Sequence, residues 1–293
     1  MALLYLNAIP SVDLLGITTI LGNAPIEVCT RNALILCERY GIDVPVYRGS
    51  ESSVTGQVPG EYPDFVHGTD GLGELDLPEP VKRVEDQPAF EYLVEAVSSH
   101  PREITILAVG RLTNLALAIN AQPDFQDLVK EVIIMGGAVN VPGNVTRWAE
   151  ANIIGDPEAA DIVFRSHLNL TMVGLDVTNA TRMSMRYIES LFSDLPDLSE
   201  FILSMNSYYA DFYLTSEATN DFPVHDSSAV AFLDDATVFD FSAGRLLCIL
   251  DGEKRGRTVF QEAESARHRV CLEVDSDRLL QNYASRIGSE YRR

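Results

Sequence analysis

Amide and carboxylate side chains gather in one stretch of the chain, Asn144, Glu150 and Asn152, a short distance beyond the apolar run 132–134. The apolar run predicts a buried strand, and in open α/β sheets ligands bind in the crevice beyond the carboxyl ends of the strands. Donors and acceptors paired at a backbone turn are suited to hold a polyhydroxylated ligand such as a sugar. The alternative is structural, because Gly and Asn mark ordinary turns and Asp156 before a proline is typical of a helix start.

A second chemical pair, His225 and Asp226, stands immediately before an apolar segment that predicts a helix. A carboxylate is favoured at a helix start by the macrodipole, and a histidine beside it is expected to titrate near neutrality. Of the five histidines, His225 is the one next to an acid at an expected helix start. The alternative is that Asp226 only caps the helix.

Three further groups are candidates for contacts with a ligand. Asn23 lies on an expected strand-to-helix turn, where it is either a turn residue or a polar contact in the crevice. His67 follows the long, aperiodic segment 48–66 and precedes three glycines, which indicates a mobile flap unless the histidine is merely solvated. Tyr209 and Tyr213 share one helical face, where they either pack in the core or stack on a planar ring.

The elements that must position these residues alternate between strands and helices. The expected strands are 14–20, 45–47, 104–109, 132–134 and 170–173, with three more around 246–250, 258–260 and 270–274. The expected helices are 2–6, 25–39, 87–99, 112–121, 157–165, 184–192, 198–214 and 276–287, and residues 176–178 are expected in a connection. This order predicts a single α/β domain over residues 1–293, with an open, mostly parallel sheet flanked by helices.

Composition excludes several classes of partner. With 22 basic and 43 acidic residues the formal net charge is −21, which opposes binding to nucleic acid or to an anionic membrane surface. The sequence has neither a secretory signal nor an apolar run of about 18 residues, so we expect a cytoplasmic location. Its four cysteines lack metal-site spacing and are expected to be free, buried thiols. No GxGxxG follows a strand, which disfavours a nicotinamide-dependent dehydrogenase.

Taken in order, these segments resemble the inosine-uridine nucleoside hydrolase family. The matching segments are 15–19 with Gly22-Asn23, Asn32-Ala33, 67–73, 112–116, 135–137, 149–152 with 156–160, and His225-Asp226. The resemblance spans nearly the whole chain. It implies a Rossmann-like three-layer fold, hydrolysis of purine or pyrimidine ribonucleosides to ribose and base in nucleoside salvage, a bound calcium ion, and a homodimer or homotetramer.

The resemblance also implies a role for each candidate residue. Asp226 would bind calcium and the ribose, the Thr113 carbonyl would be a second calcium ligand, and His225 would lie near the leaving base. His67 would approach the substrate from the flap, and Tyr209 and Tyr213 would face the base. The residues expected to hold the sugar are Asn23, Asn144, Glu150 and Asn152.

The sequence departs from the family where the family has its first strand and an aspartate-rich loop, Asp-x-Asp-x-x-x-Asp-Asp. The chain instead starts directly in the apolar helix 2–6, without an N-cap. Calcium requires about six to eight oxygen ligands, so we expect weak or absent calcium binding and slow hydrolysis. A chain shortened at its start is one interpretation, and a metal-free nucleoside- or ribose-binding protein is the other. Arg111, where the family usually has proline, and Ala151, where it often has an aromatic residue, are smaller departures.

Overall fold

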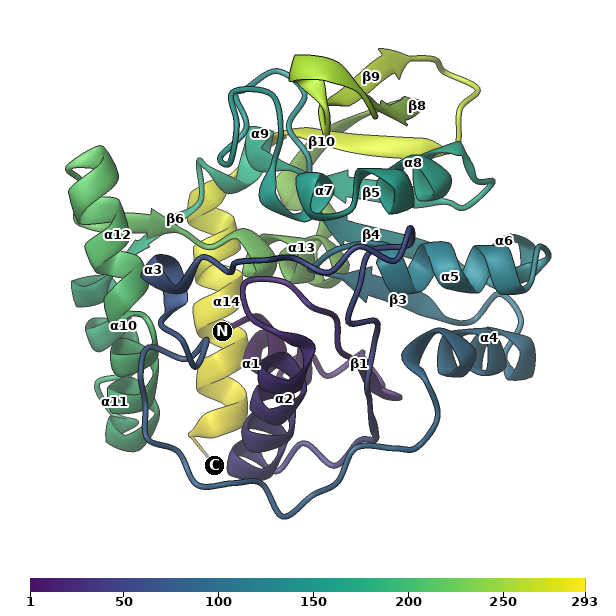
Figure 1. Ribbon diagram of the computed structural model, residues 1–293. Helices are drawn as coiled ribbons and strands as arrows, with labels where there is room; N and C mark the ends of the chain where they lie inside the picture. The colour runs from purple at the N-terminus through teal and green to yellow at the C-terminus, as the bar shows by residue number, and fades with distance from the viewer. Residues whose placement is uncertain (293) are drawn as a thin grey trace.

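The computed structural model describes residues 1–292, and its centre is a six-stranded sheet in the order β3-β4-β5-β10-β8-β9 (Figure 1). Strands β3, β4, β5 and β10 are parallel to one another, and β8 and β9 continue the sheet antiparallel. This arrangement confirms the predicted open, mostly parallel sheet. The bounds are β3 Thr105–Ala108, β4 Glu131–Met135, β5 Leu170–Val173, β8 Phe239–Cys248, β9 Thr258–Glu262 and β10 His268–Val274.

Helices cover both faces of this sheet, because the central strands alternate between two apolar clusters. Val132 and Ile134 of β4 pack with α4, α5 and α8, whereas Ile133 and Met135 pack with α1, α13 and α14 on the other face (Figure 1). Strands buried on both faces read as continuous apolar runs, which is why β4 and β5 were recognisable in the sequence. The helices are α1 Ala2–Asn7, α2 Ile26–Tyr40, α3 Asp64–His67, α4 Ala89–Ser99, α5 Thr113–Ala121, α6 Phe125–Leu128, α7 Ala151–Gly155, α8 Pro157–Arg165, α9 Leu175–Thr178, α10 Met185–Leu191, α11 Pro196–Met205, α12 Ser207–Glu217, α13 His225–Asp234 and α14 Ser276–Tyr291.

Several predicted elements differ in the structure, and the strand expected around 246–250 is the longer β8, Phe239–Cys248. The strand expected at 14–20 is only β1, Ile17–Thr18, because its ladder partner β2, Val46–Tyr47, is equally short. The helix expected at 198–214 is two helices, since the Asn206 side chain donates to the Ile202 carbonyl (2.8 Å) at the break between them. Residues 176–178 are helical rather than a plain connection. Within residues 1–292, β1 and β2 form a sheet of their own, and a third sheet pairs β6, Arg182–Ser184, with β7, Asp221–Pro223.

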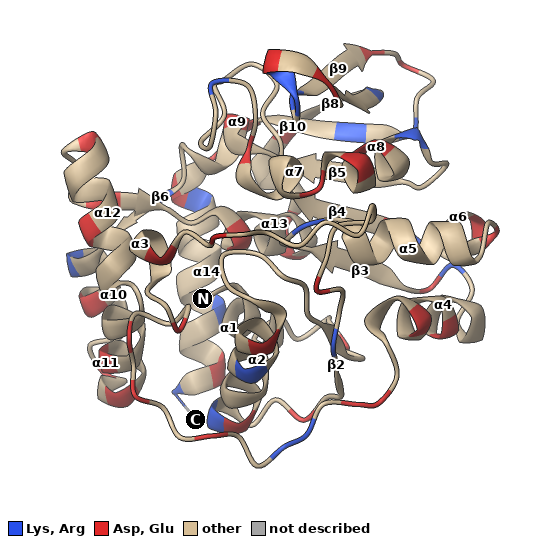
Figure 2. Cartoon of the chain, in the orientation of Figure 1, with Lys and Arg blue, Asp and Glu red and all other residues tan. Residues whose placement is uncertain are grey.

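Negative charge is spread over widely separated elements. Figure 2 shows Asp and Glu on α4, α8, α11 and α12, on several sides of the sheet. A net charge of −21 distributed in this way opposes approach to any polyanion. All four cysteines are free, as predicted, and three of them are buried, whereas Cys29 is half-buried. Among the residues that the structure describes, no helix has the length and apolar character needed to cross a membrane.

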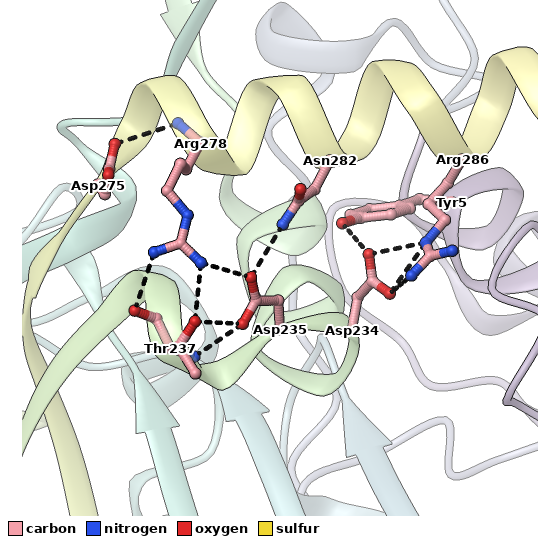
Figure 3. A network of polar contacts seen from close by, with 8 residues as sticks. All are labelled: Tyr5, Asp234, Asp235, Thr237, Asp275, Arg278, Asn282 and Arg286. Carbon is pink, nitrogen blue, oxygen red and sulfur yellow. Dashed lines mark hydrogen bonds and ion pairs between the residues drawn. The ribbon is translucent and has the colours of Figure 1, made fainter.

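A buried carboxylate joins three helices, α1, α13 and α14, which pack on one face of the sheet (Figure 3). Asp234, at the end of α13, has a side chain that is 2% exposed, and it accepts a hydrogen bond from the Tyr5 hydroxyl of α1 (3.0 Å). Arg286 of α14 donates to the same carboxylate through Nε (3.1 Å) and Nη2 (2.8 Å). Burial, followed by the Asp234 charge, raises the pKa of Tyr5 above its usual value, so the phenol stays a donor. These contacts fix the far end of the helix that begins at His225.

Replacing Tyr5 by Phe should therefore destabilise the fold. The ring would keep its packing while Asp234 lost one donor, and we expect the free energy of unfolding to fall by about 1 to 2 kcal/mol. Urea denaturation measures this change. Tyr208→Phe is the matched control, because the Tyr208 side chain is 39% exposed. Equal stability of the two variants would contradict the role assigned to the Asp234 contacts.

Candidate functional site

A cavity of about 790 Å³ opens at the rim of the sheet where β3 and β4 end. Segments far apart in the chain line it, including the β1–α2 turn, the flap before residue 74, the loop before α7, and the starts of α7 and α13. Nine of the ten predicted site residues are among the lining residues: Asn23, His67, Asn144, Glu150, Asn152, Tyr209, Tyr213, His225 and Asp226. The structure thus brings together residues that the sequence spreads over some 200 positions.

Glu150 joins the end of β4 to the start of α7. Its Oε2 accepts hydrogen bonds from the backbone N–H of Gly137 (2.9 Å) and Ile153 (3.2 Å), and its Oε1 accepts one from Asn152 N–H (3.0 Å). The residue is 2% exposed, and burial raises its pKa, although these N–H groups act in the opposite direction. Sequence reasoning identified Glu150 as a sugar contact and missed that it also caps α7. Both carboxylate oxygens of Glu150 are therefore already hydrogen-bonded to backbone N–H groups.

Two amides complete this wall of the cavity. The Nδ2 of Asn152 donates to the Met135 carbonyl (3.0 Å) and the Val109 carbonyl (3.4 Å), at the ends of β4 and β3. No residue within 1–292 donates to its Oδ1, which is therefore available to a ligand hydroxyl. Asn144 accepts from Ala151 N–H through Oδ1 (3.0 Å), which fixes the loop over α7. Asn23 is exposed in the cavity.

His225 and Asp226 form the first turn of α13. The Nδ1 of His225 lies 2.7 Å from the Thr178 hydroxyl oxygen, and its Nε2 is buried without a hydrogen-bond partner in the described part of the chain. Burial, with smaller effects from Arg182 and His67, lowers the pKa of His225 to about 4. The expectation that His225 titrates near neutrality is therefore wrong, because the sequence did not reveal how deeply the ring is enclosed.

Asp226 faces the open cavity but lies deep among protein atoms. This enclosure raises the pKa of its carboxyl to about 6, and the charge of Glu150 adds to the effect while the Met1 amino group opposes it. Unlike Glu150, the Asp226 carboxylate accepts no hydrogen bond from any described residue. Its carboxylate is consequently free to engage a ligand directly, as is that of the exposed Glu61 in segment 48–66, which also lines the cavity.

Aromatic rings form the opposite wall. His67 at the end of α3 stacks on Tyr209 of α12, with ring centroids 5.0 Å apart and an interplanar angle of 18°. Tyr213 meets Tyr209 edge-on at 5.0 Å. Burial lowers the pKa of His67 to about 4, so the ring is neutral and behaves as part of an apolar surface. The alternative that His67 is merely solvated does not hold.

The flap behind His67 is held in place by close contacts. Asn32 of α2 donates to the Asp70 carbonyl (2.7 Å), and Gly73 N–H donates to the His67 carbonyl (2.9 Å). Gly73 has φ of +80°, and a Cβ there would lie 2.9 Å from the Ser204 carbonyl oxygen of α11. Glycine is therefore required where the flap crosses the end of α11.

Thr113 is the one predicted site residue that does not line the cavity. It is fully buried at the start of α5, and its hydroxyl donates to Asp156 Oδ2 (2.7 Å). The same oxygen accepts from Val54 N–H (2.7 Å), and Oδ1 accepts from Ala159 N–H (3.2 Å). Asp156 therefore caps α8, as the structural alternative predicted, and also fastens the long segment 48–66 to the site.

The described residues do not fit a calcium ion. Calcium takes about six to eight oxygens, and no group of three or more His, Cys, Asp or Glu with metal-binding geometry exists within residues 1–292. Of the two carboxylates predicted for the site, Asp226 is free and Glu150 is bonded to three backbone N–H groups. Of the two predicted metal ligands, Asp226 lines the cavity, whereas Thr113, whose carbonyl was expected to be the second ligand, does not.

Sequence reasoning missed several other residues that line the cavity. Arg111, noted in the sequence only as a departure from the proline usual in the family, donates to the Gly155 carbonyl (3.2 Å) and the Gly22 carbonyl (3.3 Å). Burial lowers the pKa of this guanidinium, and a Cβ at Gly155 would meet its Nε at 2.5 Å. Phe65 and Phe212, with ring centroids 5.9 Å apart, extend the aromatic wall. An aromatic residue two positions before His67 was the available signal for Phe65.

The amino-acid sequence of this chain is similar to those of several known proteins. Residues 1–281 match the family described as "Inosine-uridine preferring nucleoside hydrolase". A probable uridine nucleosidase 1 of Oryza sativa subsp. japonica is 39% identical over 263 residues, 89% of this chain and 81% of that protein. An inosine-uridine preferring nucleoside hydrolase of Crithidia fasciculata is 35% identical over 81% of this chain and 75% of that protein.

Solved structures agree in fold with this chain. A plant nucleoside hydrolase superposes with a TM-score of 0.94 at 32% identity, covering 98% of this chain and 94% of its own. A purine-preferring ribonucleoside hydrolase from Gardnerella vaginalis gives a TM-score of 0.94 at 31% identity, with 99% and 94% covered.

Asp156→Asn should weaken the attachment of segment 48–66. An amide cannot accept from Val54, Thr113 and Ala159 at once, so we expect the free energy of unfolding to fall by about 1 to 3 kcal/mol. Segment 48–66 should also become a site of limited proteolysis. Asp277→Asn, at an exposed position in the first turn of α14, is the control. Unchanged proteolysis and stability would argue against Asp156 as the anchor.

Proposed function

Because the chain belongs to the inosine-uridine preferring nucleoside hydrolase family, we propose that it hydrolyses the N-glycosidic bond of ribonucleosides to release ribose and base. One observation carries the proposal: sugar-type amides, a free carboxylate and an aromatic wall with two histidines converge on a single cavity. The substrate class follows from this pairing, since one wall suits hydroxyl groups and the other suits a planar ring.

The two walls support one orientation of the substrate. We place the ribose against Asn23, Asn144, Asn152 and Asp226, and the base against the His67–Tyr209 stack with His225 beside it. The Asn152 Oδ1 and the Asp226 carboxylate are acceptors for ribose hydroxyls, and the Asn144 Nδ2 is a donor. This orientation puts the glycosidic bond between Asp226 and His225.

The chemistry follows from that placement. When the C1′–N bond breaks, both electrons go to the base and the ribosyl group gains positive charge. The Asp226 carboxylate, with Glu150 behind it, stabilises that charge. A water oxygen then forms the new bond to C1′ and its proton ends on the base. Help to a leaving group of this kind typically contributes about 10²- to 10⁴-fold.

The described residues do not supply the metal centre that the family resemblance implies. No step of the proposed reaction therefore uses a metal ion. Calcium, when bound, activates water and grips ribose hydroxyls in the family. Without it, turnover should be slow, because within residues 1–292 the free carboxylates of the cavity, Asp226 and Glu61, belong to no metal-binding group that could activate water. Homo-oligomerisation and a role in nucleoside salvage stay predictions.

A second candidate function is nucleoside or ribose binding without turnover. The same lack of a metal-binding group favours it, while the amides that face the sugar are retained. Base release measured by chromatography, beside calorimetric binding of uridine and inosine, separates the two functions. Binding without released base would support the second function.

Asp226→Asn should test the hydrolase proposal with little risk to the fold, because no described residue hydrogen-bonds to this carboxylate. We expect kcat/KM for uridine and inosine to fall by about 10²-fold or more, since a neutral amide cannot stabilise the ribosyl cation. Asp240→Asn, at an exposed position on β8, should behave like the wild type. Equal rates for both variants would rule Asp226 out of the reaction.

Titration with calcium tests the fit of the metal. We expect a Kd no tighter than about 10⁻³ M for residues 1–293, because the described carboxylates and amides of the cavity form no metal-binding group and leave most of the coordination shell to water. Calorimetry on protein treated with EDTA measures it, and the hydrolysis rate should be the same before and after chelation. Micromolar binding, or activity abolished by EDTA, would contradict the poor fit of the described ligands.

A further inference from the structure

The imidazole of His225 is held by one side-chain contact. Its Nδ1 lies 2.7 Å from the hydroxyl oxygen of Thr178, a fully buried residue at the end of α9 that does not line the cavity. Within the described residues this is the hydroxyl's one hydrogen-bond partner, and Nε2 has none. The orphaned Nε2 belongs to a residue that lines the cavity, so a ligand is the partner that it lacks.

The contact with Thr178 decides which ring nitrogen carries the hydrogen. If Nδ1 carried it, the Thr178 hydroxyl would accept, and its own buried hydrogen would find no acceptor among residues 1–292. Buried donors are rarely left without a partner. If the hydroxyl donates instead, Nδ1 accepts and Nε2 carries the ring hydrogen, so the contact leaves a single unsatisfied group, the Nε2–H, on a residue that lines the cavity.

We propose that Thr178 is a positioning residue that fixes His225 as the Nε2–H tautomer and aims this N–H at the leaving base. The inference rests on the proposed function for its kinetic consequence. As the C1′–N bond breaks with both electrons moving to the base, the Nε2–H donates a hydrogen bond to a base heteroatom and stabilises the charge there. The water that attacks C1′ supplies the proton of the released base, so His225 undergoes no net change.

The fold holds Thr178 firmly enough for this role. Leu175 N–H donates to the Gly137 carbonyl (2.8 Å), which ties the start of α9 to the end of β4. The Asp176 carboxylate accepts from the N–H groups of Val139 (2.8 Å) and Asn140 (2.7 Å), in the loop that leads to Asn144. The four-residue helix α9 thus positions two parts of the cavity. Asp176 holds the loop that leads to Asn144, and Thr178 holds the ring of His225.

Kinetics with two leaving groups test the role of Thr178. Thr178→Val removes the hydroxyl at nearly constant shape, Thr178→Ser keeps it, and Thr181→Val is a matched control that loses a buried hydroxyl bonded to Ser276 instead. We expect Thr178→Val to lower kcat for uridine and inosine about 10- to 100-fold, with KM nearly unchanged. The rate with 4-nitrophenyl riboside, whose leaving group needs no hydrogen bond, should stay near that of the wild type.

Thr178→Ser, which keeps the hydroxyl, should retain the wild-type rate with nucleosides. Thr181→Val should match the wild type with both substrates. An equal loss on nucleosides and on 4-nitrophenyl riboside would overturn the proposal, because a merely structural role lowers both rates together. A nucleoside rate for Thr178→Ser as low as that for Thr178→Val would overturn the proposal as well.

A spectroscopic measurement separates this inference from the hydrolase proposal. Long-range ¹H–¹⁵N NMR, with the His225 signals identified by their loss in His225→Gln, should show Nε2 protonated and Nδ1 bare in the wild type. Thr178→Val should shift His225 toward a mixture of tautomers. If the wild type releases no base yet shows this tautomer, the proposed function fails and the positioning role stands. A protonated Nδ1 in the neutral wild-type ring would overturn the positioning role.

Discussion

The hydrogen bonds of the Glu150 carboxylate are the constraint on which the rest of the cavity depends. Three backbone N–H groups converge on this buried side chain, one from the turn after β4 and two from the first turn of α7. Without a charged acceptor at that point, the turn and the helix start would present unpaired donors inside the protein. With it, Asn152 is brought against the ends of β3 and β4, and its amide oxygen is left for a ligand. The sugar wall is therefore a product of helix capping.

The opposite wall depends on the alternation of side chains along β4. Because Ile133 and Met135 face the cluster that contains α13 and α14, the start of α13 reaches the same rim as the loop after β4. The far end of α13 is fixed by the buried Asp234 carboxylate (Figure 3). Because α13 is anchored at one end and packed along its length, His225 and Asp226 in its first turn are held at the cavity without a flexible connection. The aromatic residues of α12 and the flap close the remaining side.

Burial shifts the pKa of several titratable groups in the cavity, as is common at functional sites. Enclosure keeps both histidines neutral and raises the pKa of Asp226 to about 6, so each group near the glycosidic bond sits away from its ordinary titration behaviour. Strong desolvation of this kind increases the effect of any charge that forms during a reaction. Hydrogen bonds among neutral groups, such as that between His225 and Thr178, accordingly help to fix the side chains in the part of the cavity assigned to the base.

The sequence by itself determined the layered α/β fold, the positions of most helices and strands, the free cysteines, and the family. Apolar runs, helical periodicity and cap residues are local signals, and β4, α2 and α8 could be recognised from them within a residue or two. The sequence also named nine residues that line one cavity. It could not show the short β1, the break at Asn206 or the helix at 175–178, because each depends on a partner distant in the chain.

Tertiary structure alone decided how the named residues act. Glu150 proved to be bonded to the backbone, Thr113 to lie outside the cavity, and His225 to be too enclosed to titrate near neutrality. Arg111 and Phe65 joined the cavity with only faint signals in the chain. The physical reason is that burial, hydrogen-bond partners and pKa are set by atoms from many segments at once, and a residue's type and neighbours in sequence do not contain that information.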